Sequence, residues 1–183
     1  ADPAKQNWQE LIPGRDRVTI EGIDAFRNHL VALERDNGLP KIRIRRLGDA
    51  AEHFIDFPEP VYTAVPGGSA EYDTTTLRFS YTSLVTPNSV YDYDMETRQR
   101  TLMKRQEVLG GYDPSQYTSE RIFAKAPDGV EVPVSLVYRK GLVKNGKAPA
   151  LLYGYGSYGL NSDPTFASDR LSLLNRGFVF AIA

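Results

Sequence analysis

The fold is decided by residues 150–159, which read Ala150-Leu151-Leu152-Tyr153-Gly154-Tyr155-Gly156-Ser157-Tyr158-Gly159. A short apolar run followed by a glycine-rich turn indicates a short buried strand that ends in a loop. The glycines let the backbone approach a bound molecule, and the tyrosine hydroxyls can donate hydrogen bonds to it. The loop is therefore the candidate functional region.

The sequence that follows this loop predicts a helix and a second strand. Ser168 or Asp169 is expected to cap a leucine-rich helix, and Gly177 is expected to end it. Residues 178–183 contain no polar side chain, which is typical of a strand covered on both faces in a largely parallel sheet. Such a strand needs neighbours on both edges, so we expect the chain to be a fragment of a larger protein.

Upstream of the loop, residues 120–126 and 130–138 flank the turn Asp128-Gly129 and predict a β-hairpin. A polar linker over residues 144–147 separates this hairpin from the strand before the glycine-rich loop. The last part of the chain is thus expected to contain, in order, hairpin, strand, loop, helix and strand.

The first two thirds of the chain are predicted to be β-structure with short strands and polar turns. The expected strands cover residues 18–20, 29–34, 41–45, 76–81 and 89–93. Turns are expected at residues 36–38 and 87–88. Leu30 and Pro40 have the same spacing as Leu77 and Pro87, and a repeat of roughly 40 to 50 residues is typical of propeller blades. A plain β-sandwich is the alternative.

Composition excludes several classes of protein. The 183 residues carry a net charge of −1, which provides no general attraction to nucleic acid or to anionic lipid. The absence of cysteine excludes disulfides and thiolate chemistry and fits a reducing compartment, so the cytoplasm is the expected location. No apolar run approaches the roughly 20 residues that a membrane span requires. We also predict no cofactor.

Several motifs of the chain resemble the prolyl oligopeptidase family, and within it the oligopeptidase B group. They are residues 128–138, the segment Leu152-Tyr153-Gly154-Tyr155-Gly156-Ser157-Tyr158-Gly159, and residues 170–179, with residues 8–13 and 86–92 upstream. The resemblance implies that residues 1–112 form the last blades of a seven-bladed β-propeller. Residues 113–183 would then form the opening strands and first helix of an incomplete α/β-hydrolase domain, giving a mixed fold.

The resemblance also implies an activity and two site residues. Members of the oligopeptidase B group are serine peptidases that cleave short peptides after Arg or Lys, and the nucleophile, a serine in a Gly-x-Ser-x-Gly turn, is expected beyond Ala183. Tyr155 matches the family's oxyanion-hole tyrosine, whose hydroxyl stabilises negative charge on the attacked carbonyl oxygen. Tyr158 matches a position that lines the pocket for the residue before the scissile bond. Gly154 and Gly156 are expected to let the backbone bend sharply around Tyr155.

Other motifs favour structural roles. The loop fits the dinucleotide spacing Gly-x-Gly-x-x-Gly, but no helix is expected to begin there. His29 and His53 are expected to be structural or surface residues, and no metal site is predicted. Residues 92–103 begin like a calcium loop, but Thr97 and Met103 stand where Gly and Glu are required, which favours a polar turn.

A short cationic stretch is expected to form a solvated strand face and not a nucleic-acid contact. Its members are Arg43, Arg45 and Arg46.

Two other functions remain open. One is a post-proline oligopeptidase of the same family, and the other is a propeller binding module attached to an inactive hydrolase-like domain. The expected partners are short peptides and the remainder of the same polypeptide, with no nucleic acid and no membrane. The 183 residues alone are expected to be inactive, because no candidate nucleophile or base lies in their hydrolase-like part.

Overall fold

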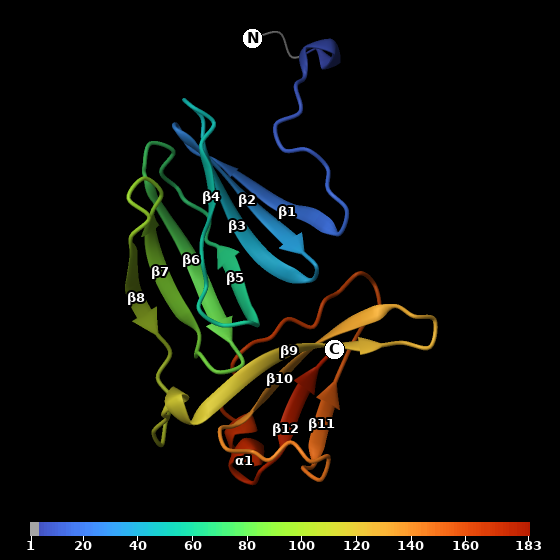
Figure 1. Cartoon of the computed structure of the whole chain (residues 1–183). Coiled ribbons are helices and arrows are strands. Elements are labelled where there is room, and N and C mark those ends of the chain that lie inside the picture. The colour runs from blue at the N-terminus through green and yellow to red at the C-terminus, as the bar shows by residue number, and fades with distance from the viewer. Residues whose placement is uncertain (1–3) are drawn as a thin grey trace.

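The computed structural model describes residues 4–183 and contains three four-stranded sheets that follow one another along the chain (Figure 1). The first sheet consists of β1 (Val18–Ala25), β2 (His29–Asp36), β3 (Leu39–Arg46) and β4 (Glu52–Phe54). The second consists of β5 (Tyr62–Pro66), β6 (Thr76–Ser83), β7 (Ser89–Asp94) and β8 (Arg100–Arg105). A short 3₁₀ helix, η1 (Lys5–Asn7), precedes the first sheet.

Both of these sheets are up-and-down meanders, in which each strand pairs antiparallel with the next one in the chain. This is the arrangement expected of propeller blades. The predicted repeat is confirmed, since Leu30 and Leu77 occupy equivalent positions near the start of β2 and β6. The five predicted strands are present, whereas β4, β5 and β8 were not predicted.

The β2–β3 turn has the geometry that its sequence predicts. Asn37 and Gly38 have φ of 49° and 83°, so both central residues of this two-residue turn are left-handed. Such a turn matches the twist of the two strands and favours Asn-Gly. The turn also brings Gly38 to the third sheet, where Arg121 donates a hydrogen bond to the carbonyl of Asn37.

The first two sheets pack against each other through one apolar core. Alternating side chains of β6 are buried, as one covered face requires. The largest fully buried side chains of this core include Phe79, Ile42, Ile44 and Leu77, which come from both sheets. Phe57 adds aromatic contacts, with its ring centroid 5.2 Å from that of Tyr81.

The third sheet follows a second 3₁₀ helix, η2 (Pro114–Gln116), and has the strand order β11-β12-β10-β9. Its strands are β9 (Tyr117–Lys125), β10 (Glu131–Arg139), β11 (Ala150–Tyr153) and β12 (Val179–Ile182). The predicted hairpin is confirmed as β9 and β10, whose turn contains Gly129 at φ 88°.

The prediction of a largely parallel sheet is wrong for these strands. Only β11 and β12 pair in parallel, while β10 is antiparallel to both β9 and β12. A tight turn between β9 and β10 forces antiparallel pairing, whereas the long connection through the helix allows β11 and β12 to run in the same direction. The sheet is therefore mixed.

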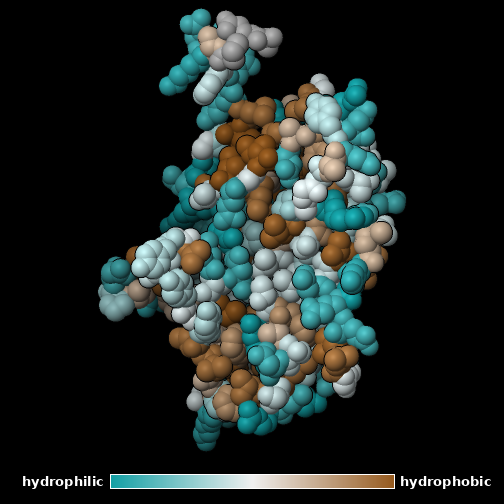
Figure 2. All heavy atoms as spheres, turned by 180° about the vertical axis from the view of Figure 1, so that it is seen from behind, coloured by the Kyte–Doolittle hydropathy of each residue, from teal (hydrophilic) through white to brown (hydrophobic). Residues whose placement is uncertain are grey.

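The two apolar strands of this sheet differ in burial. Phe180, Ala181 and Ile182 of the central strand β12 are buried in succession, which confirms a strand covered on both faces. The prediction that residues 150–153 are buried is wrong, because β11 lies at the edge of the sheet and all four of its residues are exposed. In Figure 2 hydrophobic side chains are visible over the third sheet in the lower part of the view.

The helix α1 (Arg170–Asn175) connects β11 to β12 as predicted. The Asp169 carboxylate accepts a hydrogen bond from the backbone N–H of Arg170, and Gly177 follows the helix at φ 84°. Leu174 is buried between α1 and the sheet. The cap and the glycine stop are therefore confirmed.

A second apolar core joins the third sheet to the second one. Val61, Leu84 and Val85 from the second sheet and its flanking segments pack with side chains of the third sheet and α1, among them Val137, Leu174 and Phe180. The Tyr112 hydroxyl donates to the carbonyl of Val85 at 2.5 Å. The glycine-rich loop thus begins on a sheet that is packed directly against the meanders.

Candidate active site

The glycine-rich segment that follows β11 turns at its end. Tyr158 and Gly159 have φ of 56° and 68°, and the N–H of Leu160 donates to the carbonyl of Ser157 at 3.1 Å. Neither Gly154 nor Gly156 has a left-handed φ, and the backbone bends at Ser157 and turns at Tyr158 and Gly159, so the sharp bend expected around Tyr155 lies after these two glycines. Gly154 instead lies close to the end of β12, where an added Cβ would be 3.5 Å from the Ala183 carbonyl oxygen.

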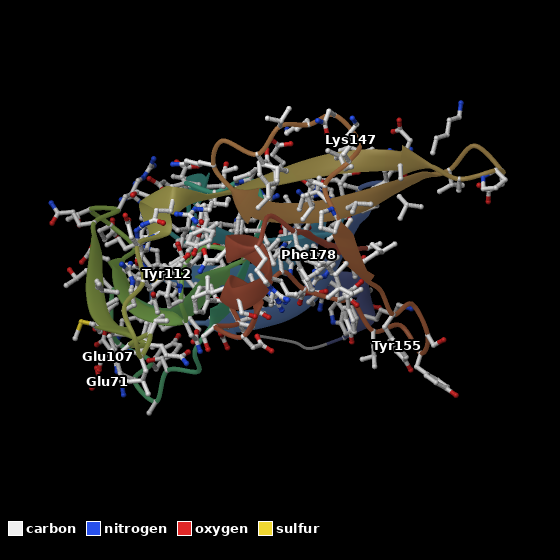
Figure 3. All side chains as sticks on the ribbon, turned by 90° about the horizontal axis from the view of Figure 1, so that it is seen from below. Glu71, Glu107, Tyr112, Lys147, Tyr155 and Phe178 are labelled. Carbon is white, nitrogen blue, oxygen red and sulfur yellow. The ribbon has the colours of Figure 1, made fainter. Side chains whose placement is uncertain are left out.

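Tyr155 lies at an opening between the third sheet and the first. Tyr155 is 47% exposed, and it lines a cavity of about 360 Å³. The same cavity is lined by Gly38 and Leu39 from the β2–β3 turn, by Arg121 from β9 and by Ala183 after β12. Figure 3 shows Tyr155 on the loop at the edge of the molecule. Tyr155 is therefore accessible at this opening.

Tyr158 lies outside this cavity. It is 93% exposed, and it is absent from the residues that line the space around Tyr155. The structure therefore does not bring the two predicted site residues together in one pocket.

Arg35 near the end of β2 was not predicted; it does not line the cavity but contacts the loop that carries Tyr155. Its Nε donates to Glu21 Oε1 at 2.5 Å, and its Nη1 donates to Asp163 Oδ1, on the loop after β11, at 2.8 Å. Burial disfavours the charged guanidinium, but hydrogen bonds to the two carboxylates outweigh this and raise the pKa of Arg35. Arg35 is therefore a fixed positive charge between a β-meander and the loop that carries Tyr155.

Arg121 lines the cavity and is a cation that was not predicted there. It donates to the Asn37 carbonyl and lies with its guanidinium carbon 5.2 Å from the ring centroid of Phe123. Burial lowers its pKa, and the nearby charge of Asp36 opposes that shift only in part. The only signal in the sequence was its place in the strand before the Asp128-Gly129 turn.

The two histidines lie far from the loop, in the first sheet. His29 is 1% exposed and its Nε2 is 3.0 Å from Glu96 Oε1. His53 Nε2 is 3.0 Å from the Tyr93 hydroxyl, and burial lowers the pKa of His53. Both positions agree with the structural roles expected of them.

The acidic residues that resemble a calcium loop form a polar turn between β7 and β8. The Asp94 carboxylate accepts hydrogen bonds from the backbone N–H groups of Glu96 and Thr97, at 2.9 Å and 2.6 Å. Within residues 4–183 no group of three or more His, Asp or Glu side chains is arranged to hold a metal ion.

The cationic stretch in β3 is not the solvated face that was expected. Arg43 is only 12% exposed and pairs with the buried carboxylate of Glu34 at 2.6 Å. Arg45 pairs with Glu52, and Arg46 pairs with Asp49 at 2.7 Å. Acidic side chains on neighbouring strands and in the adjoining turn thus neutralise these arginines.

Comparisons with known proteins place these features in one family. The family model described as "Prolyl oligopeptidase, N-terminal beta-propeller domain" matches residues 1–106. Dipeptidyl aminopeptidase BI of Pseudoxanthomonas mexicana is 40% identical over 181 residues, covering 98% of this chain and 25% of that protein. Protease 2 of Moraxella lacunata is 38% identical over 175 residues, covering 96% of this chain and 23% of that protein.

A solved structure shows the same fold along almost the whole chain. Oligopeptidase B from Trypanosoma brucei, in a closed form with covalently bound antipain, superposes with a TM-score of 0.86 at 38% identity. The match covers 94% of this chain and 26% of that one, so the chain spans about a quarter of the length of the relatives it matches. Among the helices described for residues 4–183, none has the length and apolar composition of a membrane crossing.

Proposed function

The chain belongs to the prolyl oligopeptidase family, and from this membership we propose that it is part of a serine oligopeptidase that hydrolyses short peptides after Arg or Lys. The longer protein implied by the lengths of the relatives is called the full-length protein below. The observation that carries the proposal is the position of Tyr155, half exposed at a cavity between the third sheet and a β-meander.

The proposed division of the chain follows its sheets. Residues 1–112 would be the last blades of a seven-bladed propeller, which agrees with two complete meanders that end at Arg105. Residues 113–183 would be the start of an α/β-hydrolase domain. The parallel pair β11 and β12, joined through α1, supports this assignment because α/β domains are built from such units.

The proposed mechanism is acyl transfer by a serine, histidine and aspartate located in the part of the full-length protein that these 183 residues do not span. When the serine attacks a peptide carbonyl, negative charge develops on the carbonyl oxygen. The Tyr155 hydroxyl would donate a hydrogen bond to that oxygen together with a backbone N–H group beside the serine. The covalently bound antipain in the T. brucei relative supports nucleophilic chemistry in this family.

Tyr158 would line the pocket for the substrate residue before the scissile bond. Its exposed ring can serve as one wall of such a pocket, and the carboxylates that a cationic substrate side chain needs would come from elsewhere in the full-length protein. The cytoplasm remains the proposed location.

Peptidase activity is expected to require the full-length protein. The purified 183-residue chain should release no chromophore from an Arg-ended chromogenic peptide above the buffer rate, because it contains the proposed oxyanion donor without the nucleophile. The full-length protein serves as the positive control. Hydrolysis by the short chain at a measurable rate would contradict the proposed location of the nucleophile.

A second candidate function is removal of dipeptides from the amino end of a peptide. It is favoured by the 40% identity to a protein named dipeptidyl aminopeptidase. The two functions differ in their need for a free amino terminus, so kcat/KM of the full-length protein should be measured on Arg-ended substrates with free and with blocked amino termini.

We expect hydrolysis of the blocked Arg substrate, with at least tenfold lower kcat/KM for a matched Pro substrate. Such a ratio needs only about 1.4 kcal/mol of differential transition-state binding. Activity confined to free amino termini would establish the dipeptidyl function, and a preference for Pro would establish a post-proline enzyme. No activity on any of these substrates would favour a binding module.

A further inference from the structure

The loop after β11 is attached to both β-meanders. Its Asp163 carboxylate pairs with Arg35 of the first sheet at 2.8 Å. The Thr63 hydroxyl of the second sheet donates to the Pro164 carbonyl at 3.0 Å, and the N–H of Phe166 donates to the Thr82 hydroxyl at 3.1 Å. Three contacts with the meanders, all within residues 163–166, therefore set the course of a loop that belongs to the third sheet.

One of these contacts continues to Tyr155. Ser162, the neighbour of Asp163, donates through its hydroxyl to the Tyr155 carbonyl at 3.4 Å. Ser162, Asp163 and Tyr155 also line the same cavity. A continuous series of contacts thus runs from Arg35 through Asp163 and Ser162 to the backbone of Tyr155.

Arg35 is well suited to hold this loop in a defined position. Its side chain is 15% exposed and that of Asp163 is 30% exposed, so the pair is screened by solvent and salt less than a surface pair. Glu21 holds the guanidinium from its other side at 2.5 Å. The guanidinium plane is thereby oriented before it meets Asp163, which lowers the entropy cost of the contact.

We propose that Arg35 is a positioning residue for the oxyanion donor, acting through Asp163 and Ser162 on Tyr155. The inference rests on the proposed function of Tyr155. Because Arg35 belongs to a meander and Asp163 to the loop after β11, the pair exists only while these two parts are together.

The test uses Arg35→Met and Asp163→Asn in the full-length protein, with kcat and KM measured on an Arg-ended peptide. Each variant should lower kcat about tenfold to hundredfold with KM changed less than about threefold, because a donor misplaced by 1 Å can cost about 10²-fold. Arg35→Lys keeps a charge at this site and should recover part of kcat. Arg78→Met is the matched control, since it removes an arginine that pairs with Asp92 within a meander and has no recorded contact with the loop after β11; its kcat should stay within about twofold of the parent.

A double variant distinguishes positioning from general destabilisation. If Arg35 acts through the Tyr155 hydroxyl, adding Arg35→Met to Tyr155→Phe should lower kcat no further. An equal loss of kcat in both backgrounds would overturn the inference, as would unchanged kcat in Arg35→Met and Asp163→Asn. If Arg35→Met fails to fold, Asp163→Asn, a substitution on a loop, takes its place. Its kcat is then compared with the parent and, as a double variant, with Tyr155→Phe.

The proposed function fails in a different way. Unchanged kcat in Tyr155→Phe alone would show that Tyr155 is not the oxyanion donor. The role proposed for Arg35 would then fail as well. A loss of kcat in Tyr155→Phe with none in the Arg35 and Asp163 variants would overturn only the role of Arg35.

Discussion

Tyr155→Phe in the full-length protein is expected to lower kcat by on the order of 10²- to 10³-fold, the usual cost of losing one oxyanion-hole donor. The substitution removes one hydroxyl from a residue that is 47% exposed and lines the cavity at the loop after β11. Because the hydroxyl acts mainly on charge that develops in the transition state, KM should change little. Steady-state kinetics on an Arg-ended peptide measure both constants.

Stability provides the necessary comparison for this variant. A substitution at a half-exposed position usually changes the free energy of unfolding by less than about 0.5 kcal/mol, so the thermal midpoint should be almost unchanged. Tyr153→Phe is the matched control, because it removes the same group two positions earlier in β11, at a residue that is 56% exposed and outside the cavity. Parent-like kcat in Tyr155→Phe, or an equal loss in both variants, would remove Tyr155 from catalysis.

Arg43→Met is expected to lower the free energy of unfolding of the full-length protein by about 3 kcal/mol, the size typical of breaking a buried ion pair. Arg43 contacts the Glu34 carboxylate at 2.6 Å, and the side chain of Glu34 is 1% exposed. Arg15 also contacts Glu34 at 2.7 Å, but its side chain is 33% exposed, so it compensates the remaining charge only in part. Chemical denaturation followed by fluorescence measures the change.

The effect of Arg43→Met should depend on pH in a defined direction. Burial raises the pKa of Glu34, but hydrogen bonds from Arg43 and Arg15 outweigh this and lower it below the ordinary value of 4.5. A carboxylate with a lowered pKa in the folded state stabilises the fold above its unfolded pKa, and this contribution is lost as the pH falls through the folded value. The difference between parent and variant should therefore be largest near pH 7 and shrink below about pH 4.5.

Arg78→Met is the control for burial. Arg78 forms a similar pair with Asp92 across β6 and β7 at 2.7 Å, but its side chain is 59% exposed. Its replacement should leave the denaturation midpoint nearly unchanged, because solvent screens exposed pairs. Equal losses of unfolding free energy in the Arg43 and Arg78 variants would show that the burial of Glu34 does not determine the size of the effect.

The fold was predictable from the sequence where local chemistry determines it. Alternating burial in β6 and the left-handed Asn37-Gly38 turn follow from residue types alone. β8 was missed because all six of its residues are exposed, so it has no buried face and is defined only by pairing with β7. The edge position of β11 was also missed, because Leu151 and Leu152 have the composition of a buried strand and strand order is a tertiary property.

The candidate site also has one part that the sequence predicts and one part that it does not. The glycine-rich loop and Tyr155 are visible in a short segment of sequence, whereas the contact of Arg35 with Asp163 joins residues 128 positions apart. Arg43 was predicted to be solvated because its carboxylate partners lie on neighbouring strands, which a local charge count does not reveal. Contacts between separate strands and loops therefore account for the ion pairs that the sequence did not show.

The exposed edge of β11 has a practical consequence for handling the 183-residue chain. Four uncharged residues, Ala150 to Tyr153, present free backbone groups on one side together with exposed apolar side chains. Such an edge is a template for intermolecular strand pairing, which leads to aggregation. Preparations of the chain by itself are therefore best kept dilute, and a lysine at position 152 would act as a gatekeeper against self-association.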